Sequence, residues 1–181
     1  LNVPMQDGQI SNDARIRASL PTISKALEAN CAITVLSHLG RPEEGKFDKT
    51  FSLAPIAQRL SELLSVPVNL LKDIEQSNNF SNGEIGLMEN VRFFAGETGN
   101  SDELGRRMAA CCDVFIMDAF GSAHRAHAST NAIAKYVEVV VPGFLMESEL
   151  KALDGVLQNP KPPLVAILGG SKVSSKLMLL E

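Results

Sequence analysis

The feature that most constrains this chain is a repeated alternation of short apolar runs, polar or glycine-containing loops, and amphipathic helical stretches. The apolar runs are short and several are rich in β-branched residues, which is typical of buried strands. Strands are predicted at 32–36, 66–71, 85–88, 114–117, 137–141 and 164–168. Strands that alternate with helices form a parallel sheet covered by helices on both faces. The sequence therefore predicts a three-layer α/β fold.

Helices are predicted from apolar spacing and from end signals. The predicted ranges are 21–29, 53–65, 101–112 and 144–157. Pro21 suits the first turn of a helix. Ser101, followed by two acidic residues, is typical of a helix start. Leucines recur at helical spacing from Leu53 to Leu64. The proline-rich stretch 160–163 is the best domain boundary in the chain.

Composition excludes several classes of partner. The chain has 181 residues, 45 % of them apolar, and a net charge of −4. An acidic protein has no general attraction to nucleic acid or to an anionic membrane. Apolar runs also stay short of the ~18–20 residues that span a bilayer. An anionic ligand must therefore be bound by a local cluster of positive groups.

Three cysteines, Cys31, Cys111 and Cys112, form a poor disulfide framework because one is left over and two are adjacent. We expect them to be reduced and buried, which fits the cytosol. A reactive thiol is the alternative. The chain begins without Met and ends in the start of a helical pattern, so we expect the natural protein to continue in both directions.

Basic residues gather in the loops that follow the predicted strands. These loops span 37–42, 89–93 and 118–129. They contain all three histidines and three of the eight arginines, namely Arg41, Arg92 and Arg125, while Arg15 follows the N-terminal turn. Ligands of parallel α/β sheets bind beyond the carboxyl ends of the strands. The loops therefore predict a site at that edge.

Guanidinium groups and glycine-containing loops are suited to anions, because Arg matches carboxylate and phosphate oxygens and exposed backbone amides add donors. A single arginine at such a position is often only an ion-pair partner of a nearby acid. His124 and His127 have a spacing that suggests a metal site, but Arg125 between them would repel a cation and no familiar ligand set completes it. An anion site is therefore the preferred interpretation.

A glycine turn at 169–176 follows the last predicted strand and opens a helix with Lys172 and Lys176 four residues apart. A helix start with amide donors and lysines suits phosphate. The spacing is not that of a Walker A loop. A plain structural turn remains the alternative.

Six stretches, in this order, resemble the phosphoglycerate kinase family. They are Leu1–Pro4, Asp13–Arg17, Ser37–Pro42, Glu89–Phe93, Asp118–Ser129 and Gly169–Lys176. The resemblance implies reversible phosphoryl transfer between 1,3-bisphosphoglycerate and ADP, giving 3-phosphoglycerate and ATP, by a monomeric, cytoplasmic enzyme of glycolysis. It implies a two-domain, hinge-bending kinase with Rossmann-like layers, of which this chain is a fragment.

The resemblance also implies an organisation along the chain. Residues 1–143 would be the phosphoglycerate-binding domain, 144–159 the interdomain helix, and 160–181 the start of the nucleotide domain. Mg²⁺ would come with ATP or ADP and be bound mainly by the part of that domain that this sequence lacks. No metal ligand is assigned to the present chain.

Site residues follow from the same resemblance. Arg15 and Lys172 are the candidate catalytic residues, acting on the charge of the transferred phosphoryl group. The implied substrate-binding set is Leu1, Asn2, Arg15, His38, Leu39, Gly40, Arg41, Arg92 and Arg125. The implied nucleotide-binding set is Gly169, Gly170, Lys172 and Lys176.

Three hypotheses of function remain open. The first is a phosphotransferase, with this chain as part of a complete kinase. The second is a module that binds 3-phosphoglycerate without performing chemistry. The third is an unrelated nucleotide-binding protein built around 169–176, which would leave the arginine loops without a role.

Overall fold

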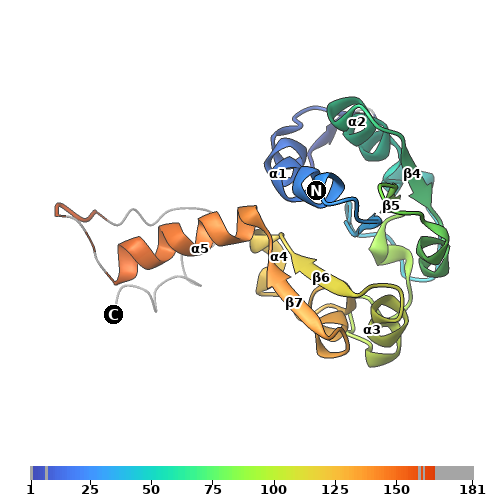
Figure 1. Ribbon diagram of the computed structural model, residues 1–181. Coiled ribbons are helices and arrows are strands. Elements are labelled where there is room, and N and C mark those ends of the chain that lie inside the picture. The colour runs from blue at the N-terminus through green and yellow to red at the C-terminus, as the bar shows by residue number, and fades with distance from the viewer. Residues whose placement is uncertain (1, 7, 159, 161, 166–181) are drawn as a thin grey trace. The chain divides into compact units, whose positions relative to one another are not determined.

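The computed structural model describes residues 2–6, 8–158, 160 and 162–165. It divides into two compact units, Leu1–Glu149 and Leu150–Glu181. The first unit contains all of the strands described below and the helices that cover them (Figure 1). The assignment of residues 160–181 to a second domain stays a prediction.

A three-stranded parallel sheet forms the first half of this unit. Its order is β3 (Ile33–Val35), β5 (Ile85–Met88) and β4 (Val68–Leu71). The central strand β5 is buried at all four positions, as expected for an apolar run flanked by strands on both sides. Val35 pairs with Leu87, and Leu71 pairs with Met88, so the loops that follow these strands leave from one edge.

A second parallel sheet contains β6 (Val114–Met117) and β7 (Val139–Pro142). A small antiparallel hairpin, β1 (Met5–Gln6) and β2 (Gln9–Ile10), lies near the N-terminus. The five strand predictions from 32 to 141 are confirmed to within a few residues, and hydrogen bonding divides those strands between two sheets. The strand prediction at 164–168 lies mostly outside the described residues.

Helices α1 (Ala14–Glu28) and α2 (Ala54–Leu64) lie against the three-stranded sheet (Figure 1). Helix α3 (Asp102–Ala109) contacts two short helical segments, η4 (Ala128–Ala132) and η5 (Ile133–Lys135). Helix α5 (Phe144–Leu157) has the predicted ends. The remaining short helices are η1 (Lys49–Phe51), η2 (Ile74–Asn79), η3 (Val91–Phe93) and α4 (Phe120–Ala123).

The prediction that Pro21 begins a helix is wrong. Helix α1 begins seven residues earlier, at Ala14, and Pro21 lies inside it. An interior proline costs a helix ~3 kcal/mol because it removes a backbone hydrogen bond and crowds the preceding turn. The helix nevertheless continues because one of its faces is buried in the core. That face carries Ile16, Leu20, Ile23 and Leu27.

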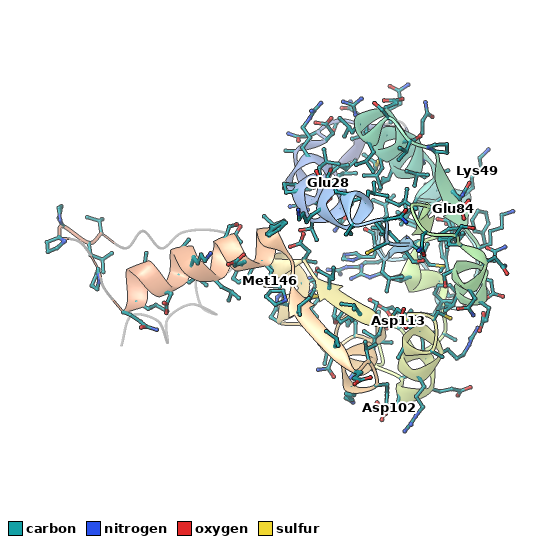
Figure 2. All side chains as sticks on the ribbon, viewed as in Figure 1. Glu28, Lys49, Glu84, Asp102, Asp113 and Met146 are labelled. Carbon is teal, nitrogen blue, oxygen red and sulfur yellow. The ribbon has the colours of Figure 1, made fainter. Side chains whose placement is uncertain are left out.

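Charged side chains such as Glu28, Lys49 and Glu84 are exposed on the surface (Figure 2). The expectation of buried cysteines is wrong for Cys31, which is exposed. It lies just after the end of α1, where the chain turns at the surface before β3. Cys111 and Cys112 are half-buried, and all three cysteines are free thiols.

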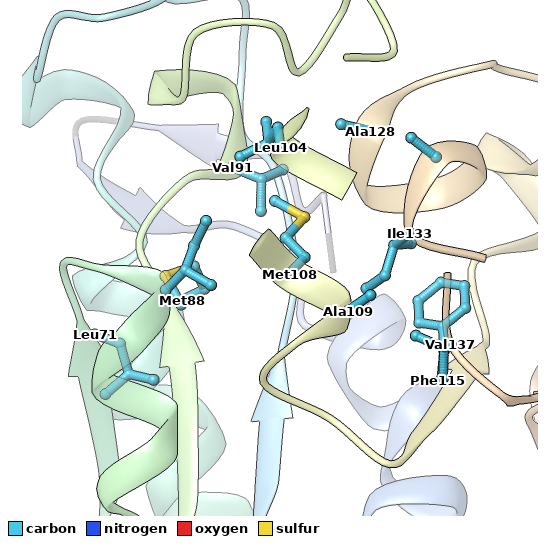
Figure 3. Close-up of a cluster of buried hydrophobic side chains, with 12 residues drawn as sticks. Leu71, Met88, Val91, Leu104, Met108, Ala109, Phe115, Ala128, Ile133 and Val137 are labelled. Atoms are coloured by element: carbon cyan, nitrogen blue, oxygen red, sulfur yellow. The ribbon is translucent and has the colours of Figure 1, made fainter. Parts of the chain in front are cut away.

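Two hydrophobic clusters form the core of the first unit. The first joins α1 and α2 to the three-stranded sheet. The second contains Leu71 and Met88 from that sheet, Met108 from α3 and Phe115 from β6 (Figure 3). Because the second cluster draws on both sheets, apolar packing joins them where backbone hydrogen bonds do not.

Candidate functional site

The loop after β3 is held in shape by side chains of the loop after β5. Asn90 Nδ2 donates to the carbonyl oxygens of Leu39 at 2.7 Å and Phe51 at 3.0 Å. Arg92 Nη1 donates to the carbonyl of Gly40. Gly40 has a φ of +63°, and a Cβ there would lie 2.3 Å from the Phe51 ring. Glycine is therefore required both for the backbone conformation and for the space.

The loop after β5 turns its first two side chains inward. Glu89 accepts hydrogen bonds from Ser52 Oγ at 2.8 Å and from the backbone N–H of Leu53 at 2.7 Å, at the start of α2. Asn90 is fully buried. These two residues support the loops, whereas the charge of Arg92 also interacts with those of Arg125 and Arg41.

The loop after β6 is fixed by a buried carboxylate that the sequence analysis missed. Glu97 is 1 % exposed and accepts hydrogen bonds from Ser129 Oγ at 2.6 Å and Ser129 N at 3.0 Å. Its backbone carbonyl accepts from Ala128 N at 2.9 Å, and its Oε1 lies 3.7 Å from His127 Nδ1. Burial raises the pKa of Glu97, while Ser129 and Arg92 oppose that shift. Glu97 does not directly follow a predicted strand, so no strand-end signal pointed to it.

Charges from the three loops act on two basic residues, Arg92 and His38. Burial lowers the pKa of Arg92, and the charges of Arg125 and Arg41 lower it further. Burial, followed by Arg92 and Arg125 among other charges, lowers the pKa of His38 from 6.5 to about 4. We call Arg41, Arg92, Arg125 and His38 the basic cluster.

His127 lies beside the basic cluster. Burial, and after it Arg92 and Arg125, lower the pKa of its imidazole. Arg41 and Arg125 are exposed, whereas Arg92 is 7 % exposed. The structure thus brings Arg41, Arg92, Arg125 and His38 near one another in the loops that follow β3, β5 and β6.

Arg15 is connected to the basic cluster through Asn2. Arg15 Nη1 donates to the carbonyl oxygen of Asn2 at 2.5 Å. Asn2 Nδ2 lies 3.4 Å from Nε2 of His38, which can accept this bond when the imidazole is neutral. Asn2 and Arg15 also line a shallow hollow of about 430 Å³. The candidate residues of the N-terminal segment therefore adjoin the loop after β3.

Two buried polar atoms near these loops have no hydrogen-bond partner within the part of the chain that the structure describes. They are Arg92 Nε and Ser37 Oγ. Buried polar groups are nearly always bonded in folded proteins, so such atoms at a cluster of charges indicate a place for a ligand or water. Both residues lie in loops that leave the shared edge of the three-stranded sheet.

The other candidate residues lie outside the described residues. These are Leu1, Gly169, Gly170, Lys172 and Lys176. Within the described ranges, no group of three or more His, Cys, Asp or Glu side chains could hold a metal ion. Among those residues, no helix has both the length and the apolar character needed to cross a bilayer.

The chain was compared with known proteins. The family model described as phosphoglycerate kinase matches residues 1–181. Phosphoglycerate kinases of Legionella pneumophila and Desulfovibrio desulfuricans are each 55 % identical over all 181 residues. The chain covers 46 % of the length of each of these relatives.

Solved structures agree with this match. The phosphoglycerate kinase of Coxiella burnetii is 53 % identical, with a TM-score of 0.93 over 99 % of this chain and 46 % of that one. The enzyme of Pyrococcus horikoshii is 33 % identical, with a TM-score of 0.87 over 99 % of this chain and 47 % of that one. The chain belongs to the phosphoglycerate kinase family.

Proposed function

We propose that this chain is the substrate-binding part of a phosphotransferase of glycolysis. The complete protein would transfer a phosphoryl group reversibly between 1,3-bisphosphoglycerate and ADP, giving 3-phosphoglycerate and ATP. The observation that carries the proposal is the basic cluster, in which three arginines and a histidine from three strand-end loops lie near one another. Family membership supplies the identity of the ligand.

The basic cluster suits a polyanion on electrostatic grounds. The positive charges of Arg125 and Arg41 lower the pKa of Arg92, so the cluster is electrostatically unfavourable when no anion is bound. The carboxylate of Glu97 opposes part of that effect. A phosphate that accepts hydrogen bonds from several guanidinium groups gains about 1.5–3 kcal/mol from each good charged bond. We therefore assign Arg41, Arg92, Arg125 and His38 to the phosphate that is not transferred, with Leu39 and Gly40 in the same loop.

The other end of the substrate is assigned to Asn2 and Arg15, with Leu1 beside them. Arg15 would bind the carboxyl group and stabilise the phosphoryl group during transfer, together with Lys172. Phosphoryl transfer needs mainly positioning and neutralisation of charge. No general base is required, because the attacking group is already an anion.

The remaining assignments also rest on family membership. Gly169, Gly170, Lys172 and Lys176 would contact the nucleotide phosphates, and Mg²⁺ would arrive with ATP or ADP. We propose a cytoplasmic, monomeric protein whose partners are these small molecules, with no nucleic acid or membrane among them. Because the chain covers 46 % of its relatives' length, we propose that alone it binds substrate without turnover.

Calorimetric titration of this chain with 3-phosphoglycerate tests the proposal. Binding should weaken as salt rises, and it should weaken by at least about tenfold in Arg41→Ala and in Arg125→Ala. Arg107→Ala is the matched control, because Arg107 forms its ion pair with Glu75 away from the basic cluster. Equal affinities in wild type, Arg41→Ala and Arg125→Ala would refute the assignment.

A further inference from the structure

The first turn of α5 is held by side chains from two distant parts of the chain. The backbone N–H of Phe144 donates to Thr22 Oγ1 at 3.0 Å, and the N–H of Met146 donates to Asp118 Oδ1 at 3.0 Å. Thr22 Oγ1 in turn donates to Asp118 Oδ2 at 2.6 Å. Thr22 lies in α1, and Asp118 directly follows β6. We call these four residues the α5 anchor.

In the α5 anchor, Thr22 and Asp118 accept hydrogen bonds from the first turn of the helix, as the side chain of a capping residue usually does. The first N–H groups of a helix have no partner within the helix, and a carboxylate there also interacts favourably with the helix dipole. Gly143 precedes the helix and has no side chain with which to cap it. Its own N–H donates to the carbonyl of Met117 at 2.9 Å. The partners of the first turn therefore come from the body of the first unit.

Gly143 is also needed for space. A Cβ at this position would lie 2.3 Å from Cγ of Asp118, which is closer than side-chain carbons approach. The carboxylate of Asp118 thus lies directly against the backbone at the start of the helix. This close approach lets Asp118 reach the N–H of Met146.

Among the described residues, the buried apolar contact of α5 lies at its start. Met146, labelled in Figure 2 at the start of the helix, is 6 % exposed. Farther along, Leu150, Leu153 and Val156 are between 45 % and 49 % exposed. Because Met146 is the one buried residue of the helix, the hydrogen bonds of the first turn have a large share in setting its direction.

The α5 anchor is joined to the proposed substrate site through the chain itself. Asp118 is the first residue of the loop that carries Arg125 of the basic cluster, and α4 lies between them. Thr22 lies on α1, whose first turn carries Arg15. The two segments that hold α5 are therefore the two segments that bring Arg15 and Arg125 to the site.

We propose that Thr22 and Asp118 are positioning residues for phosphoryl transfer. They fix the direction in which α5 leaves the substrate-binding unit, and so position the part of the chain that follows for reaction with the bound phosphoglycerate. They touch neither the substrate nor the nucleotide. The inference rests on the proposed function, since it concerns the same transfer.

The test uses a full-length protein that contains this sequence, with Thr22→Val and Thr22→Ser. Valine has the shape of threonine but cannot bridge Phe144 and Asp118, whereas serine keeps the hydroxyl. Small misplacements far from the chemistry can cost a factor of up to 10² in rate. We expect Thr22→Val to lower kcat by about tenfold or more, with the Kd for 3-phosphoglycerate changed less than about twofold. Thr22→Ser should restore most of kcat.

Thr50→Val is the matched control, because Thr50 Oγ1 makes an equally short bond of 2.6 Å to a carboxylate, that of Asp48. Its kcat should equal that of the wild type. An unchanged kcat in Thr22→Val would overturn the proposal. So would a loss of kcat that Thr22→Ser does not rescue, or one matched by an equal loss of substrate affinity, because each indicates a general structural defect.

Amide hydrogen exchange separates this proposal from the proposed function. In Thr22→Val the amides of Phe144 and Met146 should exchange about fivefold faster or more, while amides of β5 stay unchanged. If the wild type shows no phosphotransferase activity, the proposed function fails on that result alone. Exchange at Phe144 and Met146 that is equal in the wild type and Thr22→Val would then refute the α5 anchor independently.

Discussion

The buried residues that support the loops of the basic cluster and the exposed arginines of that cluster use their polar groups in different ways. Glu89, Asn90 and Glu97 are at most 6 % exposed, and their polar atoms are bonded to backbone or hydroxyl groups. Arg41 and Arg125 are exposed. The polar atoms of the buried residues are hydrogen-bonded within the protein, whereas the exposed guanidinium groups are available to bind a ligand. Substitutions should therefore separate stability from activity.

The largest effect is expected from Arg15→Ala in the full-length protein. Loss of one donor to the charge of a transition state typically costs a factor of about 10²–10³ in kcat. Arg15 is exposed, and within the described residues its side chain donates to the carbonyl of Asn2, so the melting temperature should change little. Steady-state kinetics and thermal unfolding check this. Near-normal turnover would remove Arg15 from the catalytic residues.

Asn90→Ala should have the largest effect on stability. It leaves the buried carbonyl of Leu39 and the part-buried carbonyl of Phe51 without the Nδ2 donor, and each unsatisfied buried group costs about 1–3 kcal/mol. We expect a loss of about 3 kcal/mol in the free energy of unfolding, measured by urea denaturation. Asn69→Ala, at an exposed position of β4, is the control and should stay within about 0.5 kcal/mol of wild type. Equal stability of the two variants would contradict the supporting role.

Arg92 combines properties of the buried supports and of the exposed arginines, so Arg92→Ala should affect both stability and binding. Its side chain is 7 % exposed and donates to the carbonyl of Gly40, yet its charge belongs to the basic cluster. The variant should lose both about 1–2 kcal/mol of stability and about tenfold in affinity for 3-phosphoglycerate. Arg125→Ala should lose affinity alone. Identical profiles for the two variants would show that the distinction between support and ligand contact is wrong.

The smallest effect concerns pH. The pKa of His38 falls from 6.5 to about 4 on folding, chiefly through burial, so between these values the unfolded chain binds more protons. The stability that depends on His38 is therefore present above pH 6.5 and is lost as pH falls toward 4. Partial exposure limits the effect to about 1 kcal/mol between pH 7 and pH 5. Between pH 7 and pH 5, the free energy of unfolding of His38→Gln should therefore fall by about 1 kcal/mol less than that of the wild type. Urea denaturation at each pH measures this difference.

Sequence patterns found the strand-end loops because two kinds of signal coincide there. A short apolar run predicts a buried strand, and the arginine or histidine that follows it marks the end of that strand. The parallel arrangement then brings Arg41 and Arg92 to one edge without any knowledge of coordinates. Identity of the ligand came from family resemblance, since guanidinium groups alone specify only an anion.

The supports and the α5 anchor could not be found in this way. Glu97 acts on a loop about thirty residues farther along, and Thr22 bonds to Asp118 across 96 positions. Such bonds depend on packing, not on local spacing. Helix α1 shows the same limit, because the burial of Ile16 and Ile23 keeps the helix intact through Pro21.

A crystal structure of this protein with 3-phosphoglycerate tests the central claim most directly. We expect the phosphate oxygens to lie within hydrogen-bonding distance of Arg41, Arg92 and Arg125, with the carboxylate near Arg15. A ligand bound elsewhere, or a phosphate held by none of these arginines, would contradict it.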